Sequence, residues 1–193
     1  MRSCRMLENN STPVPCPLIR MRIDRTEFEF ICRLEPEVGS DGTVVSLMPQ
    51  PRYKNPNNLS LNTYGAGPFC KFRIPRQFNT SGVYALVVGS SIKYIGECVN
   101  LSSRYNSGYG NISPRNCFKG GQETNCRLNA RIYIEVQLGH QVELWFHATR
   151  EHKQLEKCLL AANDYEWNRG AMRTTSHSTG LARKVAQAGQ FKR

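Results

Sequence analysis

The sequence lacks an apolar run that could cross a membrane, since a spanning helix needs roughly 20 consecutive apolar residues. Its opening, Met-Arg-Ser-Cys-Arg-Met-Leu-Glu-Asn-Asn, has no apolar core of the kind that signal peptides carry. Acidic residues are scarce: 15 Asp and Glu stand against 26 Lys and Arg, which gives a net charge of +11. We therefore expect a cytoplasmic protein without membrane spans that is attracted to polyanions, although this charge alone fits a ribosomal or membrane-surface protein equally well.

The sequence also lacks any Cys-x-x-Cys pair, although it contains eight cysteines. Zinc sites usually combine such a pair with a second pair or with histidines at short spacing. The scattered cysteines therefore predict reduced, mostly buried thiols. Hydrophobic residues make up 39% of the chain and charged residues 21%, which indicates a globular protein rather than a disordered tail.

The most regular stretch of the sequence is typical of a β-hairpin. Residues 82–88 and 92–96 are rich in β-branched and aromatic side chains, and a Gly-Ser-Ser turn at 89–91 joins them. Residues 100–105 then predict a short helix. With this spacing, three side chains can meet on one side of the sheet: Tyr84, Tyr94 and Arg104.

Regular elements are also predicted after this hairpin. Residues 125–138 carry an apolar stripe typical of a helix, with Thr124 available to cap its first turn. Residues 142–149 alternate like a strand, and residues 151–163 again have helical periodicity. The polar segment 106–125 between them is long for a simple connection, so we expect it to be functional or mobile.

The first 78 residues are less regular. Residues 23–34 fit either a strand or a helix, and residues 43–47 predict a short strand. A glycine-rich turn at 65–67 leads to a second expected strand at 69–74, with Lys71 and Arg73 on one face. That segment is either an ordinary turn and edge strand or a place where cations lie beside a nucleic acid.

Three short motifs resemble the GIY-YIG nuclease family. They are Gly-Val-Tyr at 82–84, Tyr-Ile-Gly at 94–96, and Asn-Leu-x-x-Arg ending at Arg104. Leu155-Glu156 in the last helix and Trp167-Asn168 after it are similar to the rest of the family signature. The resemblance implies a mixed α/β fold with a GIY-YIG core at 79–170, in which helices flank a small three-stranded antiparallel sheet. Residues 1–78 would form an N-terminal extension available for contact with DNA, and residues 171–193 a basic tail that is either disordered or a phosphate-binding arm.

The resemblance also implies roles for five side chains. Tyr84 would take a proton from the attacking water, Tyr94 would assist, and Arg104 would stabilise the phosphate. Glu156 would hold one Mg²⁺, for which Mn²⁺ can substitute, and Asn168 would complete the catalytic set. Without the resemblance, cross-strand packing would account for the tyrosines, and pairing with a neighbouring lysine would account for Glu156.

Many family members have a His or Lys shortly after the Arg, but this chain has no His there. We expect Lys119 to substitute for it, with Tyr109 as the second choice. His147 could act as a base, but a lone His on a strand is more often structural. We expect the following residues to contact nucleic acid: Tyr109, Arg115, Lys119, Arg127, Lys71 and Arg73.

These features predict a metal-dependent endonuclease that acts on double-stranded DNA, of the restriction or phage type. A palindromic target would imply a homodimer or two binding events. The alternatives are a DNA repair or recombination nuclease, a nucleic-acid-binding module without the chemistry, and a basic structural protein of a ribonucleoprotein.

Overall fold

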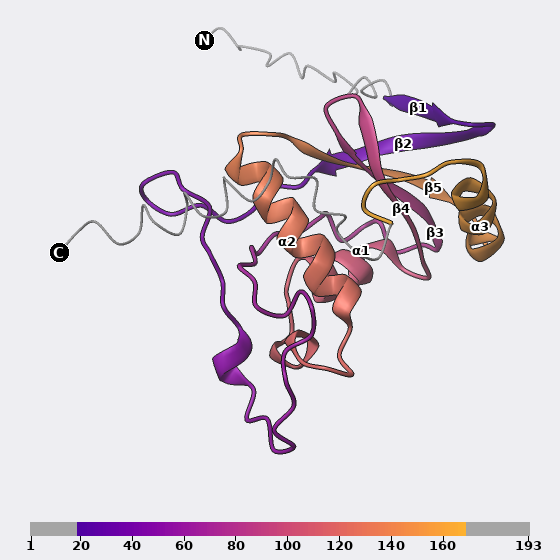
Figure 1. Cartoon of the computed structure of the whole chain (residues 1–193). Coiled ribbons are helices and arrows are strands. Elements are labelled where there is room, and N and C mark those ends of the chain that lie inside the picture. Colours follow the sequence, from indigo (N-terminus) through magenta and orange to yellow (C-terminus); the bar gives the residue numbers. More distant parts are fainter. Residues whose placement is uncertain (1–18, 169–193) are drawn as a thin grey trace, which may run out of the picture.

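The structure is a computed structural model that describes residues 19–168, and its centre is one five-stranded antiparallel sheet (Figure 1). The strand order is β1-β2-β5-β3-β4. The strands are β1 (Arg20–Ile23), β2 (Thr26–Arg33), β3 (Gly82–Val88), β4 (Ser91–Cys98) and β5 (Val142–Ala148). The expected hairpin is therefore confirmed as β3 and β4, and the expected third strand as β5.

The prediction of a three-stranded sheet is wrong, because a hairpin from the N-terminal segment extends it. β1 pairs with β2, and β2 pairs with β5 on the side opposite β3. Phe28 is buried on β2 while Glu27 and Glu29 are exposed, so this segment has the alternation of a strand with one face covered. Strands from both sides of residue 78 thus share one sheet. The predicted tail at 171–193 lies outside the described residues.

Helices lie on both faces of the sheet. They are α1 (Leu101–Arg104), α2 (Glu123–Gln137) and α3 (His152–Ala162). Leu128 and Ile132 of α2 pack against one face, and Leu159 of α3 packs against the other. This two-sided cover explains why β3 is apolar along almost its whole length. The helix α2 begins at Glu123, and the expected cap by Thr124 is wrong because Gln122 occupies the N-cap position.

Residues 43–47 and 69–74 do not form the expected strands. Only isolated bridges occur there, between Val38 and Val44 and between Leu47 and Phe69. The backbone of the second segment is instead held by asparagine side chains. Asn129 accepts from the Cys70 amide at 2.8 Å and donates to the Cys70 carbonyl at 2.7 Å, and Asn106 bonds both backbone groups of Ile74.

A second, smaller body of the chain extends away from the sheet. We call residues 47–68 and 111–121 the lobe; it forms the projection at the bottom of Figure 1. It includes the single turns η1 (Gln50–Arg52) and η3 (Pro114–Cys117), and its apolar side chains Ile112, Cys117 and Phe118 form a cluster with Phe69 and with Cys126 of α2. Within residues 19–168, no helix has the length and apolar character needed to cross a membrane.

The Asn129 side chain makes three buried hydrogen bonds to backbone groups, because its amide also donates to the Tyr109 carbonyl at 2.6 Å. Asn129→Ala leaves these groups without partners, and we expect it to lower the free energy of unfolding by about 3 kcal/mol. Urea unfolding measures this loss. The control is Asn163→Ala, which removes an exposed amide and should cost no more than about 0.5 kcal/mol. Equal losses in the two variants would contradict the structural role of Asn129.

Candidate active site

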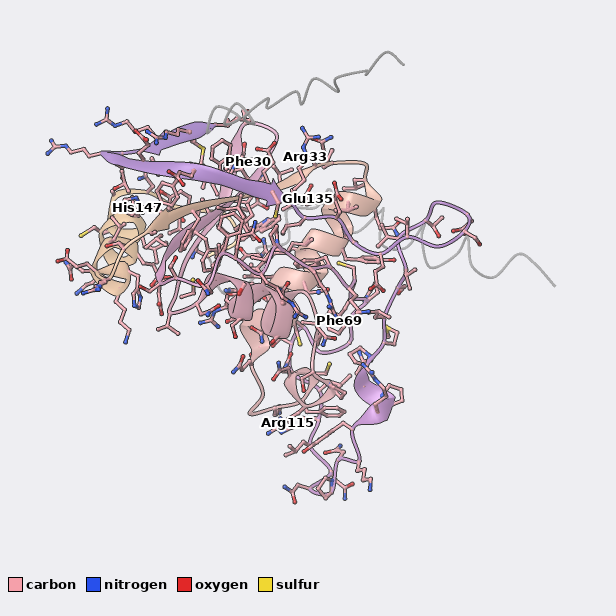
Figure 2. The ribbon with its side chains drawn as sticks, turned by 180° about the vertical axis from the view of Figure 1, so that it is seen from behind. Phe30, Arg33, Phe69, Arg115, Glu135 and His147 are labelled. Atoms are coloured by element: carbon pink, nitrogen blue, oxygen red, sulfur yellow. The ribbon has the colours of Figure 1, made fainter. Side chains whose placement is uncertain are left out.

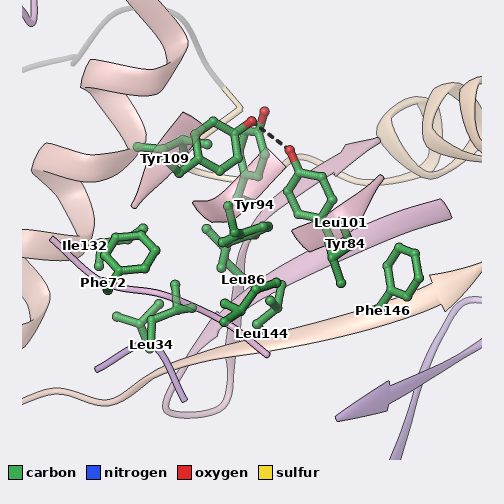
Figure 3. Packing of buried hydrophobic residues seen from close by; sticks show 14 of the residues in the cluster. Leu34, Phe72, Tyr84, Leu86, Tyr94, Leu101, Tyr109, Ile132, Leu144 and Phe146 are labelled. Atoms are coloured by element: carbon green, nitrogen blue, oxygen red, sulfur yellow. Dashed lines mark hydrogen bonds between the residues drawn. The ribbon is translucent and has the colours of Figure 1, made fainter. Parts of the chain in front are cut away.

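Three tyrosine hydroxyls converge at one end of the sheet (Figure 3). Tyr84 comes from β3, Tyr94 from β4, and Tyr109 from the turn that follows α1. The hydroxyl oxygens of Tyr84 and Tyr109 are 2.7 Å apart, and the Tyr94 hydroxyl is also hydrogen-bonded to Tyr109. All three side chains are buried. The chain therefore places a phenol cluster where the resemblance predicted catalytic tyrosines.

Gly96 makes room for this cluster. In the β3–β4 pairing it lies directly opposite Tyr84. A Cβ atom at residue 96 would lie 2.5 Å from the Tyr84 hydroxyl oxygen and 2.7 Å from the ring of Tyr94. Contacts this short are not tolerated, so the glycine of the Tyr-Ile-Gly motif lets the Tyr84 ring lie across β4.

A π-helical turn brings Tyr109 next to Arg104. The N-cap of α1 is Asn100, whose side-chain Oδ1 accepts from the Ser103 amide at 2.8 Å. After Arg104 the helix widens into the π turn Tyr105–Tyr109. In an α-helix a residue lies above the one four positions earlier, and the wider turn extends this relation to five. The Arg104 guanidinium carbon accordingly lies 5.8 Å from the centre of the Tyr109 ring.

Two carboxylates and a histidine lie beside Arg104. Glu156 is half-buried on α3, and burial together with the nearby charge of Glu97 raises its pKa. A backbone hydrogen bond from Glu97 and the charges of Arg104 and His152 oppose that rise in pKa. His152 Nδ1 is 2.7 Å from Glu97 Oε2. Glu156 forms no ion pair with a lysine within the described part of the chain, so the lysine-pairing interpretation lacks support.

Burial governs the acidity of the phenols. It raises the pKa of Tyr84, Tyr94 and Tyr109 above the usual value near 10. At Tyr109 hydrogen bonds from the other two phenols and the positive charge of Arg104 oppose the increase in pKa. At Tyr84 desolvation, the neighbouring phenols and the hydrogen bond with Tyr109 all act in the same direction and raise the pKa. Negative charge is therefore best accommodated at Tyr109.

Asn168 is close to this end of the sheet but serves the backbone. Its Oδ1 accepts from the Ile95 amide at 2.9 Å, and its Nδ2 donates to the Ile95 carbonyl at 2.7 Å. The Trp167 amide also donates to the Lys93 carbonyl at 2.8 Å. Since β4 is an edge strand, these bonds fix the strand that carries Tyr94. The structure thus gives Asn168 a positioning contact.

Of the two residues expected to replace the usual loop His or Lys, Tyr109 joins the phenol cluster. Lys119 lies in the lobe, where its amide donates to the Ser60 carbonyl and its carbonyl accepts from Arg115. Figure 2 shows Arg115 in that projection. Sequence spacing could not distinguish the two candidates, because the π turn shifts the position that faces Arg104 by one residue.

The other residues expected to contact nucleic acid are dispersed. Arg127 lies on α2 close enough to Tyr94 that its charge opposes the rise in pKa that burial produces. Lys71 is paired with Glu37 at 2.6 Å, and Arg73 is exposed on the irregular segment before β3. His147 lies opposite Val83 in the β3–β5 pairing, but its ring packs against Phe28 on the other face of the sheet from Tyr84. Its Nδ1 is 2.8 Å from the Glu27 carbonyl, as a structural histidine would be.

Glu97 and His152 were not identified from the sequence. Glu97 directly follows the Tyr-Ile-Gly motif. His152 precedes Glu156 by four residues, so His152 and Glu156 lie on one side of α3. That helical spacing could have indicated His152. Nothing local indicates Glu97, because its partner lies more than 50 residues away in the sequence.

A hard divalent cation fits the Glu156 side of the site. Within residues 19–168 no group of three or more His, Cys, Asp or Glu side chains is arranged to hold a metal. Mg²⁺, however, keeps several waters and needs only one or two protein carboxylates. The negative charge of Glu97 disfavours the charged form of Glu156, and a bound divalent cation would offset this repulsion.

Comparisons of this chain with protein-family models, curated proteins and solved structures found no match.

The raised pKa of Glu156 predicts a pH-dependent stability. The unfolded chain loses this proton near pH 4.5, before the folded chain does, so the free energy of unfolding should fall as pH rises from about 4.5 through the folded pKa. In Glu156→Gln this decrease should be absent in urea titrations with EDTA. Glu151→Gln, an exposed position next to the same helix, is the control and should retain the wild-type profile. A profile of Glu156→Gln that matches wild type would contradict the shift.

Proposed function

We propose that this chain is a metal-dependent endonuclease that hydrolyses phosphodiester bonds in double-stranded DNA. The observation that carries the proposal is the hydrogen-bonded pair of Tyr84 and Tyr109 next to Arg104, with Glu156 close by. Phosphodiester hydrolysis needs a base for the attacking water, a cation for the phosphoryl oxygens and support for the leaving oxygen. The residues in this cluster are of the types that supply these functions.

The proton path uses the phenol pair. This path requires the cluster to lose one proton before attack, and Tyr109 would carry the charge because Arg104 and the hydrogen bonds from the other two phenols oppose the rise in its pKa. As water attacks phosphorus, its proton passes to the Tyr84 oxygen while the Tyr84 proton moves to Tyr109, so both phenols end neutral. The Tyr84–Tyr109 distance of 2.7 Å suits this transfer.

Arg104 stabilises the charge that builds on the phosphoryl oxygens. Its side chain is partly buried, which strengthens its interaction with an anion relative to one in water. Glu156, with Glu97 beside it, would bind Mg²⁺ or Mn²⁺, which supplies Lewis-acid stabilisation of the phosphate and leaving oxygen. His152, fixed against Glu97, orients that carboxylate.

The finer assignment belongs to the same proposal. We assign the chain to the restriction or phage type of GIY-YIG nuclease, with a cytoplasmic location and a homodimer on palindromic targets. A second candidate, a nucleic-acid-binding module without cleavage, is favoured by the raised pKa values of the phenols, since burial keeps these groups protonated at neutral pH.

Cleavage of supercoiled plasmid tests the proposal. With Mg²⁺ or Mn²⁺ we expect the wild-type protein to nick or cut the plasmid, and both Glu156→Ala and Arg104→Ala to reduce the rate by at least about 100-fold. The controls are Glu151→Ala and Arg150→Ala, which remove exposed charges from the start of the same helix region. Gel electrophoresis follows the reaction. Binding without cleavage under both metals would favour the binding-module candidate instead.

The phenol assignment has its own test in a hydroxyl deletion. Tyr109→Phe removes the group that carries the negative charge, so we expect cleavage to slow by about 100-fold or more, with little change in DNA affinity. Tyr105→Phe is the matched control, because the Tyr105 hydroxyl is buried and has no hydrogen-bond partner in the described residues. Single-turnover cleavage rates of the Tyr109→Phe and Tyr105→Phe variants are compared. Equal rates in both variants would exclude Tyr109 from the proton path.

A further inference from the structure

The lobe concentrates positive charge that the proposed chemistry does not use. Between Asp41 and Glu123 the sequence has a single acid, Glu97, against nine Lys and Arg. Four of these cations are in the lobe, which contains no Asp or Glu: Arg52, Lys54, Arg115 and Lys119. A projection with cations and no acids creates a positive potential that attracts polyanions.

The lobe cations differ from those of the sheet in their partners. On the sheet and its surroundings, Arg20 pairs with Glu27 at 2.7 Å and Lys93 with Glu166 at 2.7 Å. Across residues 19–168, no ion pair involves any of the four lobe cations. Arg52, Lys54 and Lys119 are also exposed. Their charges are therefore available to an external anion.

The lobe is held in one shape by its own contacts. Asn62 donates to the Asn116 carbonyl at 2.6 Å and joins its two segments, and Gln50 donates to the Gly65 carbonyl at 2.6 Å. Arg115 is fixed over the Tyr53 ring at 5.7 Å and donates to backbone carbonyls. A preorganised surface loses little conformational entropy when a ligand binds.

The lobe is also continuous with the candidate active site. The chain leaves Tyr109 and enters the lobe at residue 111, and the lobe ends just before α2 begins. In Figure 1 the projection continues from the region of α1 and the nearer end of α2. A single extended ligand, such as a nucleic acid, could therefore contact the lobe and the phenol cluster together.

We propose that the lobe is the docking element for duplex DNA, with Arg52, Lys54 and Lys119 on the phosphates next to the cleaved strand. This inference rests on the proposed nuclease function for the choice of DNA. The charge of the lobe and its lack of internal ion pairs suit a polyanion, and its fixed shape suits a ligand as stiff as a duplex.

Salt-dependent binding tests this docking role. The affinity of the full chain for a 30-bp duplex is measured at several salt concentrations in EDTA, which prevents metal-dependent cleavage. Each lost phosphate contact should reduce the slope of log affinity against log salt by about 0.9. We expect Arg52→Ala/Lys54→Ala to lower the slope by about 2, and added Lys119→Ala to lower it by about 1 more. The matched control, Arg22→Ala/Arg25→Ala, removes two exposed cations of the β1–β2 hairpin and should leave the slope unchanged.

Several results would overturn the proposal. They are an unchanged slope in the lobe variants, an equal loss in the hairpin control, or tighter binding of an RNA hairpin of the same length. The unfolding midpoint of each variant must match wild type, which these exposed positions should allow. A lobe-dependent slope in a protein that cuts no plasmid would leave docking intact and reject the nuclease. Cleavage that is insensitive to the lobe variants would reject docking alone.

Discussion

Side-chain amides that take the place of a β-ladder hold this structure together. Asn129, Asn106 and Asn168 each bond the amide and the carbonyl of a single residue, at Cys70, Ile74 and Ile95. A buried backbone needs partners for both groups, and a carboxamide presents N–H donors and a carbonyl acceptor side by side. The irregular chain before β3 and the outer edge of β4 are thereby fixed to the sheet without becoming strands.

These amides also determine the geometry of the phenol cluster. Asn129 holds the Tyr109 carbonyl at 2.6 Å, and Asn106 belongs to the same π turn as Tyr109. Asn168 fixes β4 one residue away from Tyr94. The cluster is therefore rigid and dry, which positions its hydroxyls well but raises the pKa of each phenol. The same burial that positions the three hydroxyls makes them weaker acids, and the charge of Arg104 opposes this effect at Tyr109.

Local patterns predicted what depends on short-range chemistry. The β3–β4 hairpin, β5 and the two long helices followed from periodicity and turns, because each is set by neighbouring residues. The β2–β5 pairing was not predictable, since it joins residues more than 100 positions apart. The π turn was missed because it adds one residue to a helical spacing. As a result Lys119 was preferred as the partner of Arg104, whereas Tyr109 occupies that position. The strand expected at 69–74 was wrong because asparagine side chains bond the backbone of Cys70 and Ile74. The strand expected at 43–47 was wrong because its backbone forms only isolated bridges.

Glu97, the one acid between Asp41 and Glu123, lies close to Glu156, the residue proposed to bind a divalent cation. Burial and the charge of Glu97 raise the pKa of Glu156, so the charged form of this carboxyl is disfavoured. His152 and Arg104 offset only part of the combined effect of desolvation and this repulsion, because the pKa of Glu156 stays above its ordinary value. A carboxylate pair that stays under repulsion destabilises the folded chain unless a ligand compensates it. A divalent ion bound to these oxygens would convert that cost into binding energy, which connects the electrostatics of Glu97 with the proposed metal-dependent chemistry.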